Sequence, residues 1–321
     1  MRAFVTGGTG FVGSYLARAL RRRGDEVVVL ARSPSKAAFL GDLGCNLVEG
    51  EVGDAGLMRN AMDGCDAAFH CAGVYRVGIP DSERPAMYLA NVRGTERVPD
   101  AAIDAGVRRV IHVSTVNVFG NTAGKVVDES YRRPGGDFLS YYDETKFLAH
   151  RIALDRIARG APILIVQPGG VYGPGDHSEI GGQIELMRAG KLPFLSFPGL
   201  GFNFVHVEDA ADGMLRVHDM GRVGEPYVLG GELTSMGELI RKVAEITGRG
   251  VPRLVMPTSL MRLAAHIGPI VSRVLGVPPN LREIIRAADG VTYWATDAKA
   301  RRDLGYSPRN LDTGLRQLLA A

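Results

Sequence analysis

Short apolar runs alternate with helical patterns through the first half of the chain. The runs are rich in β-branched residues, as in strands covered on both faces, and the alternation predicts βαβ units with a parallel sheet. The predicted strands are Ala3–Thr6, Val27–Ala31, Asn46–Glu49, Ala67–Cys71, Arg109–Ser114 and Ile163–Gln167. The predicted helices are Tyr15–Arg23, Leu57–Met62, Ala86–Ala105 and Tyr142–Arg159. We therefore expect an α/β fold built on a doubly wound parallel sheet.

The pattern changes after Gln167, where the run PGGVYGPGD is rich in glycine and proline. This change predicts a boundary between a first domain, residues 1–170, and a smaller C-terminal lobe, residues 171–321. Strand patterns return at Phe202–Val207 and Pro226–Leu229. We expect strands near residues 202–229 to rejoin the first sheet, so that the two units interleave.

Composition describes an ordinary globular chain of 321 residues, with 45% hydrophobic and 23% charged residues. The net charge of +3 is small and the basic residues are scattered, which argues against nucleic acid as a partner. Cys45, Cys65 and Cys71 are odd in number and lack metal-ligand spacing. We therefore expect no disulfide framework, no metal site and a cytoplasmic location.

No apolar run reaches the length of a membrane-spanning helix, so we expect no integral membrane segment. The first residues enter a strand at once, which leaves no room there for a signal peptide. Residues Ser259–Leu275 place apolar side chains on one helical face. This spacing favours a core-packing helix, kinked at Gly268-Pro269, over a membrane-surface segment or a substrate lid.

The run TGGTGFVG, Thr6–Gly13, lies between the first predicted strand and the first helix. Its glycines fit either a Gly7-x-x-Gly10-x-x-Gly13 or a Gly8-x-Gly10-x-x-Gly13 pattern. In both, glycine permits a tight turn and a close approach of the backbone to a pyrophosphate, which then faces the helix N-terminus. The first domain is therefore predicted to be a Rossmann-type dinucleotide-binding domain, and the C-terminal lobe to bind the substrate.

The end of the second strand predicts which dinucleotide is bound. A protein that selects NAD usually has an acid there for the ribose hydroxyls, whereas this chain has Ala31 followed by Arg32, with Lys36 nearby. An arginine can hold a 2′-phosphate through paired charge-assisted hydrogen bonds. We expect NADP(H), with NAD(H) as the alternative if Arg32 only points into water.

Two further segments at predicted strand ends could contact the cofactor. After the third strand, Glu51 could accept a hydrogen bond from the adenine amino group while Val52 packs against the ring, although a plain surface acid is an equal reading. After the fourth strand, the small residues Cys71, Ala72 and Gly73 could leave room for the phosphates, or could serve close packing of strand and helix.

Tyr142 and Lys146 are four residues apart at the start of a predicted helix, so they share one helical face. An ammonium beside a phenol favours the phenolate and lowers the pKa of the tyrosine, which makes Tyr142 a candidate acid-base group. Ser114 and Thr115 end the fifth strand, at the sheet edge where ligands of open α/β sheets bind. A hydroxyl there could hold a substrate oxygen.

Together these motifs resemble the extended branch of the short-chain dehydrogenase/reductase superfamily, which contains the NAD-dependent epimerase/dehydratase family and the dihydroflavonol-reductase-like enzymes. Other segments also fit: Asn91-Val92-Arg93-Gly94-Thr95, Val118-Phe119-Gly120, Tyr172-Gly173-Pro174-Gly175 and Phe204-Val205-His206-Val207-Glu208-Asp209. The resemblance implies catalytic roles for Thr115, Tyr142 and Lys146, with Lys146 also holding the nicotinamide ribose. It implies further cofactor contacts from Gly7, Thr9, Gly10, Phe11, Val12, Gly13, Val113, Pro168 and Val171.

The same resemblance narrows the reaction. Dehydratases of this branch have Asp-Glu after the catalytic hydroxyl, where Val116-Asn117 stand here. Nucleotide-sugar enzymes commonly have an asparagine where Gly170 stands and an arginine where Gln167 stands. We therefore expect an NADP(H)-dependent reductase or dehydrogenase acting on a carbonyl/alcohol pair. An NAD-dependent sugar epimerase is the alternative, because the chain also resembles the hopanoid-associated sugar-epimerase-like group, and a non-catalytic cofactor-sensing protein is a third.

The substrate and the assembly are less defined by the sequence. Tyr75, His177 and Phe204 are candidates to line the substrate pocket, although ordinary packing is the favoured role for each. The partner expected from the resemblance is a small molecule. Relatives often pair through a helix bundle that would contain Ala86–Ala105 and the Tyr142 helix, so a homodimer is one assembly that the resemblance allows.

Overall fold

A seven-stranded parallel sheet forms the centre of the computed structural model, which describes residues 1–266 and 280–320. Its strands lie in the order β3-β2-β1-β4-β5-β6-β9. The order reverses between β1 and β4, which is the switch point where ligands bind in open α/β sheets. The predicted doubly wound sheet is thus confirmed. The strands are β1 (Arg2–Thr6), β2 (Glu26–Ala31), β3 (Asn46–Glu49), β4 (Ala67–His70), β5 (Arg109–Val113), β6 (Ile163–Pro168) and β9 (Pro226–Leu229).

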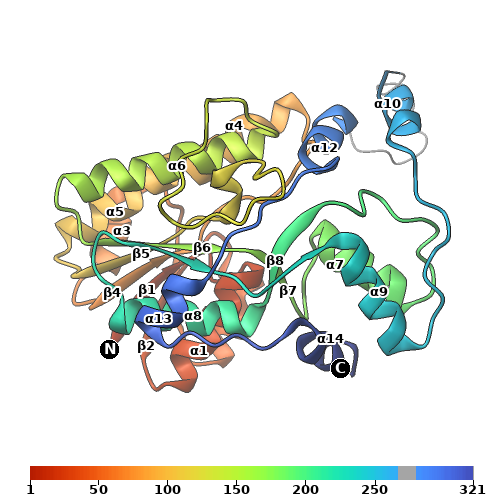
Figure 1. The fold of residues 1–321 in the computed structure, drawn as a ribbon. Coiled ribbons are helices and arrows are strands. Elements are labelled where there is room, and N and C mark those ends of the chain that lie inside the picture. The colour runs from red at the N-terminus through yellow and green to blue at the C-terminus, as the bar shows by residue number, and fades with distance from the viewer. Residues whose placement is uncertain (267–279, 321) are drawn as a thin grey trace.

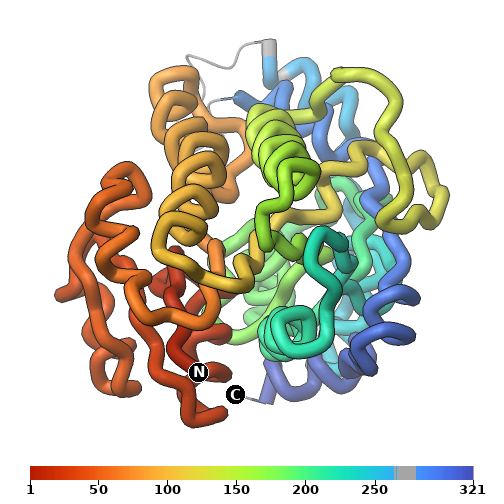
Figure 2. The backbone as a smooth tube through the Cα atoms, turned by 90° about the vertical axis from the view of Figure 1, so that its left-hand side faces the viewer, coloured from red at the N-terminus to blue at the C-terminus, as the bar shows by residue number. Residues whose placement is uncertain are grey.

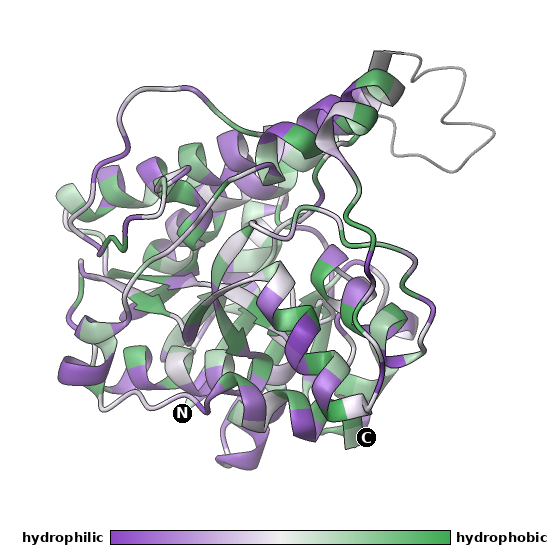
Figure 3. Ribbon diagram, turned by 45° about the vertical axis from the view of Figure 1, so that its right-hand side comes forward, coloured by the Kyte–Doolittle hydropathy of each residue, from purple (hydrophilic) through white to green (hydrophobic). Residues whose placement is uncertain are grey.

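Helices cover both faces of this sheet (Figure 1). One face carries α1 (Phe11–Arg22), α8 (Val207–Met220) and α13 (Ala298–Leu304); the other carries α3 (Ala55–Ala61), α5 (Gly94–Asp104) and α6 (Tyr141–Ala158). Alternate strand residues point to opposite faces, so Val5 belongs to the core under α1 and α8, while Phe4 belongs to the core under α3 and α5. Hydrophobic residues accordingly fill the strands between the two helical layers (Figure 3).

The helix predicted at Ala86–Ala105 is divided by a wider turn. The chain forms α4 (Arg84–Tyr88), a π-helical turn at Leu89–Arg93, and then α5. The buried Asn91 lies in the π turn and explains it, because its side chain accepts a hydrogen bond from the Val74 amide at 2.7 Å and donates to the Thr145 hydroxyl at 3.0 Å. The contact with Thr145 joins the π turn to α6, and α5 and α6 stand side by side in Figure 2.

A three-stranded sheet forms the core of the C-terminal lobe. It contains β7 (Gly170–Tyr172), β8 (Gly201–His206) and β10 (Glu232–Ser235), with β8 parallel to β7 and antiparallel to β10. Of the two segments expected to return to the main sheet, β9 pairs with β6, whereas β8 belongs to the smaller sheet. The division at residue 170 stays a prediction. Helices α7 (Glu179–Arg188), α9 (Met236–Thr247) and α14 (Leu311–Ala320) surround this sheet.

Three short helices complete the described part: α2 (Ala38–Asp42), α10 (Thr258–His266) and α12 (Leu281–Ala288). The segment Ser259–Leu275 was expected to pack in the core, yet Leu260 and Leu263 are 54% and 61% exposed on α10. Residues 267–275 of that prediction lie outside the described residues. Among the described helices, none combines the length and apolar character that a membrane crossing requires.

Candidate active site

The glycine turn between β1 and α1 has the geometry of an anion-binding loop. Gly7 has a φ of +72°, which glycine adopts without strain, and the Gly10 amide donates to its carbonyl oxygen at 3.0 Å. A Cβ atom on Gly13 would lie 2.2 Å from the same oxygen. Helix α1 begins after Gly10 with no side-chain cap and no acid in its first turn, so its first N–H groups are free for a phosphate.

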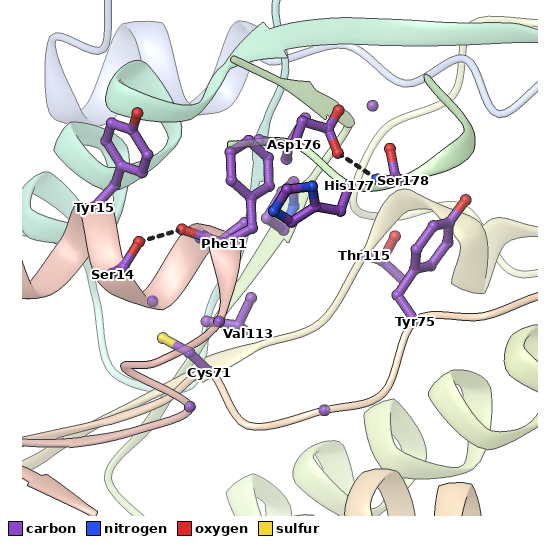
Figure 4. Close-up of a pocket in the computed structure, with 18 of the residues that line it drawn as sticks. Phe11, Ser14, Tyr15, Cys71, Tyr75, Val113, Thr115, Asp176, His177 and Ser178 are labelled. Atoms are coloured by element: carbon purple, nitrogen blue, oxygen red, sulfur yellow. Dashed lines mark hydrogen bonds between the residues drawn. The ribbon is translucent and has the colours of Figure 1, made fainter. Parts of the chain in front are cut away.

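A cavity of about 650 Å³ opens beside this turn, at the carboxyl ends of the central strands (Figure 4). The structure brings most of the residues predicted from the sequence to its wall. These are Gly7, Thr9, Gly10, Phe11, Val12, Gly13, Cys71, Gly73, Val113, Thr115, Tyr142, Lys146, Pro168 and Val171. One cavity therefore brings together the glycine turn, the Tyr142–Lys146 pair and the Thr115 hydroxyl, which are far apart in sequence.

Helix α6 positions Tyr142 and Lys146. The helix starts at an N-cap serine, Ser140, whose hydroxyl accepts from the Asp143 amide at 3.0 Å. Tyr142 and Lys146 are each 8% exposed, and Nζ of Lys146 donates to the carbonyl oxygen of Val113 at 2.9 Å. This bond fixes the ammonium beside the end of β5, one turn of helix from the phenol.

Burial sets the protonation of the pair. Burial raises the pKa of Tyr142 above its ordinary value, and a hydrogen bond with Thr115 opposes that rise only in part. Burial also lowers the pKa of Lys146 to about 8. The sequence predicted that the ammonium would lower the pKa of the phenol; in the structure burial raises that pKa instead, and the ammonium is bonded to the Val113 carbonyl. The Tyr142 hydroxyl therefore keeps its proton at neutral pH.

Thr115 lies beside the phenol at the end of β5. It is 7% exposed, its hydroxyl donates to Oδ1 of Asn117 at 3.0 Å, and both residues line the cavity. Ser114, the neighbouring hydroxyl, forms a hydrogen bond of 3.0 Å with Nδ1 of His150 on α6. Of the two hydroxyls, Thr115 is therefore the one that contacts Tyr142.

Five cofactor candidates from the sequence do not line the cavity. Arg32 and Lys36 are exposed beyond the carboxyl end of β2, Glu51 is exposed after β3, and Val52 is half-buried. The backbone amide of Ala72 donates to the Thr6 hydroxyl at 3.2 Å instead of facing the cavity. Contacts from these residues to a dinucleotide stay predictions.

A row of buried polar residues under α5 and α6 was not anticipated from the sequence. His70 and His112 are partners on β4 and β5, with ring centroids 5.5 Å apart, and both are at most 2% exposed. Burial lowers the pKa of His70 to about 3 and that of His150 to about 4, so both are neutral. His150 carries the one sequence signal for this row, since it lies four residues after Lys146 on the same helical face.

The wall opposite the glycine turn is largely apolar and aromatic. The Tyr75 ring meets the Tyr142 ring edge-on, with centroids 4.8 Å apart and an interplanar angle of 88°. Tyr75 and His177, both labelled in Figure 4, line the cavity together with Ile180 and Phe202, whereas Phe204 is 1% exposed and packs in the core. Tyr75 and His177, which were candidates from the sequence, therefore line the cavity. Phe204 has the packing role that was favoured for it, whereas Phe202, which was not a candidate, lines the cavity.

Asp176 adds a carboxylate to this wall, from the loop after β7. Its Oδ1 accepts from the Ser178 amide at 2.8 Å, as Figure 4 shows. Burial raises the pKa of this carboxyl. Among the described residues, no group of histidine, cysteine and acidic side chains is arranged to hold a metal ion.

Residues 3–230 match the model of the NAD dependent epimerase/dehydratase family. The chain belongs to this family of the extended short-chain dehydrogenase/reductase superfamily, whose members use NAD(P), and the resemblance inferred from the sequence is confirmed.

The similarity to characterised relatives and to solved structures covers nearly the whole chain. The chain is 32% identical to a 4-hydroxy-2-methyl-3-oxo-4-farnesyl-3,4-dihydroquinoline-1-oxide ketoreductase of Stigmatella aurantiaca, over 96% of this chain and 92% of the relative. It is 30% identical to a 3 beta-hydroxysteroid dehydrogenase/Delta 5→4-isomerase of Mycobacterium tuberculosis, over 96% and 86%. A dTDP-glucose 4,6-dehydratase variant from Streptomyces venezuelae with NAD bound superposes with a TM-score of 0.79 at 26% identity, over 100% and 96%.

Proposed function

We propose that the protein is an NADP(H)-dependent reductase or dehydrogenase that interconverts a carbonyl and an alcohol. One observation carries this proposal: a buried tyrosine, with a threonine hydroxyl and a buried lysine beside it, shares a cavity with an uncapped glycine-rich helix N-terminus. Because Gly13 has no Cβ, the start of α1 can pack against the Gly7 carbonyl, and both glycines line the cavity, so these residues fit a dinucleotide.

The reaction needs a hydride and a proton, and the bound NADP(H) supplies or takes the hydride. In the reductive direction, Thr115 and Tyr142 donate hydrogen bonds to the carbonyl oxygen of the substrate. As the carbon accepts the hydride, the oxygen gains negative charge and takes the proton of the Tyr142 hydroxyl, which yields the alcohol. The Lys146 ammonium then stabilises the phenolate that remains, and Val113 holds that ammonium in place.

The preference for NADP(H) rests on the end of β2. Ala31 is 2% exposed and offers no carboxylate, while Arg32 and Lys36 lie exposed beyond it, on the side of the glycine turn. Two cations after a strand that itself ends without an acid favour a 2′-phosphate over free ribose hydroxyls.

The pocket wall favours an uncharged ketone over a nucleotide sugar. A side chain at Gly170 would meet Phe202 and Phe204 at 3.0 Å, so an asparagine there lacks space. Gln167 is 1% exposed and lies away from the cavity wall, where it cannot contact a diphosphate. The aromatic residues Tyr75 and Phe202 instead offer apolar contact to a large organic substrate.

The test is NADPH oxidation across a panel of bulky aromatic and alicyclic ketones, with wild type, Tyr142→Phe and Tyr141→Phe. Loss of the proton donor is expected to lower kcat about 10²–10⁴-fold in Tyr142→Phe. Tyr141→Phe is the matched control, because the adjacent ring is half-buried outside the cavity wall, and it should retain activity. Equal activity of wild type and Tyr142→Phe would refute the assignment. Purified protein that carries NAD and oxidises no NADPH would favour a sugar epimerase.

A further inference from the structure

Glu283 is a buried carboxylate at the junction of the two lobes. It belongs to α12, is 9% exposed, and accepts from the Tyr141 amide through Oε1 at 2.9 Å. The same oxygen accepts from the Gly78 amide at 3.4 Å, and Oε2 accepts from the Asn280 side chain at 2.9 Å. The Arg84 guanidinium lies 3.7 Å from Oε2. Residues far apart in sequence thus meet at one side chain, where α12 lies near α4 and α6 (Figure 1).

The contact with Tyr141 acts on the helix that carries the proton donor. Tyr141 is the first residue of α6, and its N–H is one of those that a helix cannot satisfy internally. Ser140 caps the Asp143 amide in the same turn, so Glu283 supplies a second, anionic partner. A negative charge at a helix N-terminus also interacts favourably with the helix dipole. The first turn of α6, and with it Tyr142, is therefore held from the C-terminal lobe.

The contact with Gly78 acts on the other neighbour of the phenol. Gly78 is joined to α12 in both directions, because its amide donates to Glu283 and its carbonyl oxygen accepts from the Asn280 amide at 3.2 Å. The segment before it carries Tyr75, whose ring lies edge-on against Tyr142. One carboxylate therefore fixes both the helix turn that bears the phenol and the loop whose ring confines it.

We propose that Glu283 is a positioning residue, which sets the Tyr142 phenol against Tyr75 and Thr115 by tying α12 to the first turn of α6. The proposal rests on the proposed function, since it assigns a role in the same site. Glu283 does not line the cavity and has no part in the proton transfer itself. Its effect is to keep the donor hydroxyl in the orientation that the transfer requires, and a small misplacement of such a group is costly.

The test compares Glu283→Ala, Glu283→Asp and Glu283→Gln with a control on the same helix, Arg286→Ala. Arg286 is 52% exposed and pairs with an exposed Asp137, so its loss should leave the site unchanged. The first measurement is amide hydrogen exchange, which needs no turnover. Exchange at Tyr141 and Gly78 is expected to rise about tenfold or more in the alanine and aspartate variants, and to stay near wild type in Glu283→Gln, whose amide oxygen can still accept.

The second measurement compares kcat and KM for a ketone substrate, together with the dissociation constant of NADPH, between wild type and the variants. We expect kcat to fall about 10- to 100-fold in Glu283→Ala with the dissociation constant of NADPH unchanged, and Glu283→Gln to recover most of it. Glu283→Asp is the decisive variant if the alanine protein does not fold. Unchanged exchange at Tyr141, or a wild-type kcat despite faster exchange, would overturn the proposal. If the wild type reduces no ketone, but exchange at Tyr141 and Gly78 rises in the variants as predicted, the proposed function is refuted and the positioning contact is supported.

Discussion

The buried ion pair between Arg133 and Asp143 of α6 predicts a large loss of stability on substitution. The Arg133 guanidinium binds the Asp143 carboxylate through two bonds of 2.7 and 2.9 Å, and the side chains are 4% and 1% exposed. Oδ2 of Asp143 also accepts from the Leu139 amide at 2.9 Å. Arg133→Met would leave the carboxylate buried without its cation, which costs about 3–5 kcal/mol in comparable cases.

The assay is urea unfolding of wild type, Arg133→Met, Asp143→Leu and the double variant. Each single variant leaves one charged group without its partner, so the double variant should lose less than the sum of the two single losses. Arg188→Met is the control, because its pair with Glu185 is about half-exposed, and a change within about 0.5 kcal/mol is expected. A loss below about 1 kcal/mol in Arg133→Met would show that water reaches Asp143 and would refute the reasoning.

Two further predictions concern charged groups at the cofactor. Arg32→Ala is expected to raise the dissociation constant of NADP⁺ about 10- to 100-fold and to leave that of NAD⁺ unchanged, because the lost bonds are to the 2′-phosphate; calorimetric titration checks this, and a wild type that prefers NAD⁺ would contradict it. Burial lowers the pKa of Lys146 from 10.5 to about 8 in the folded protein, so the unfolded chain holds more protons between those pH values. The stability of the cofactor-free wild type should therefore rise relative to Lys146→Met between pH 8 and pH 10.5, by on the order of 2–3 kcal/mol. Urea unfolding at both pH values measures it, and a constant difference would exclude the shift.

Local patterns were the part of the site that the sequence could predict. The glycine turn and the Tyr142–Lys146 spacing depend on contacts within a few residues, so strand-turn-helix order and helical period place them. The pKa of Tyr142 depends on how deeply the ring is buried, and burial arises from segments far away in sequence. The lowering of this pKa that was predicted from Lys146 alone was therefore wrong, and burial raises it.

Long-range pairing explains what the sequence left out. The local pattern around Asn91 does not predict a π turn. The turn arises from the hydrogen bonds of the Asn91 side chain with the Val74 backbone and the Thr145 hydroxyl, which are distant in sequence. The histidines His70 and His112 read as ordinary strand residues until β4 and β5 are paired in register. Phe202 and Phe204 are two residues apart and share one face of β8, with ring centroids 5.7 Å apart, so only their position along the strand decides which of them reaches the cavity.

The last strand of the main sheet, β9, comes from residues beyond 200 and hydrogen-bonds along β6. A fragment that ended at residue 170 would present Ile165, which is fully buried in the whole chain, next to an open row of backbone donors and acceptors. Bare apolar edges of this kind recruit other chains and aggregate. Residues 1–170 should therefore be expressed together with the rest of the chain, and the two parts should unfold as one cooperative unit.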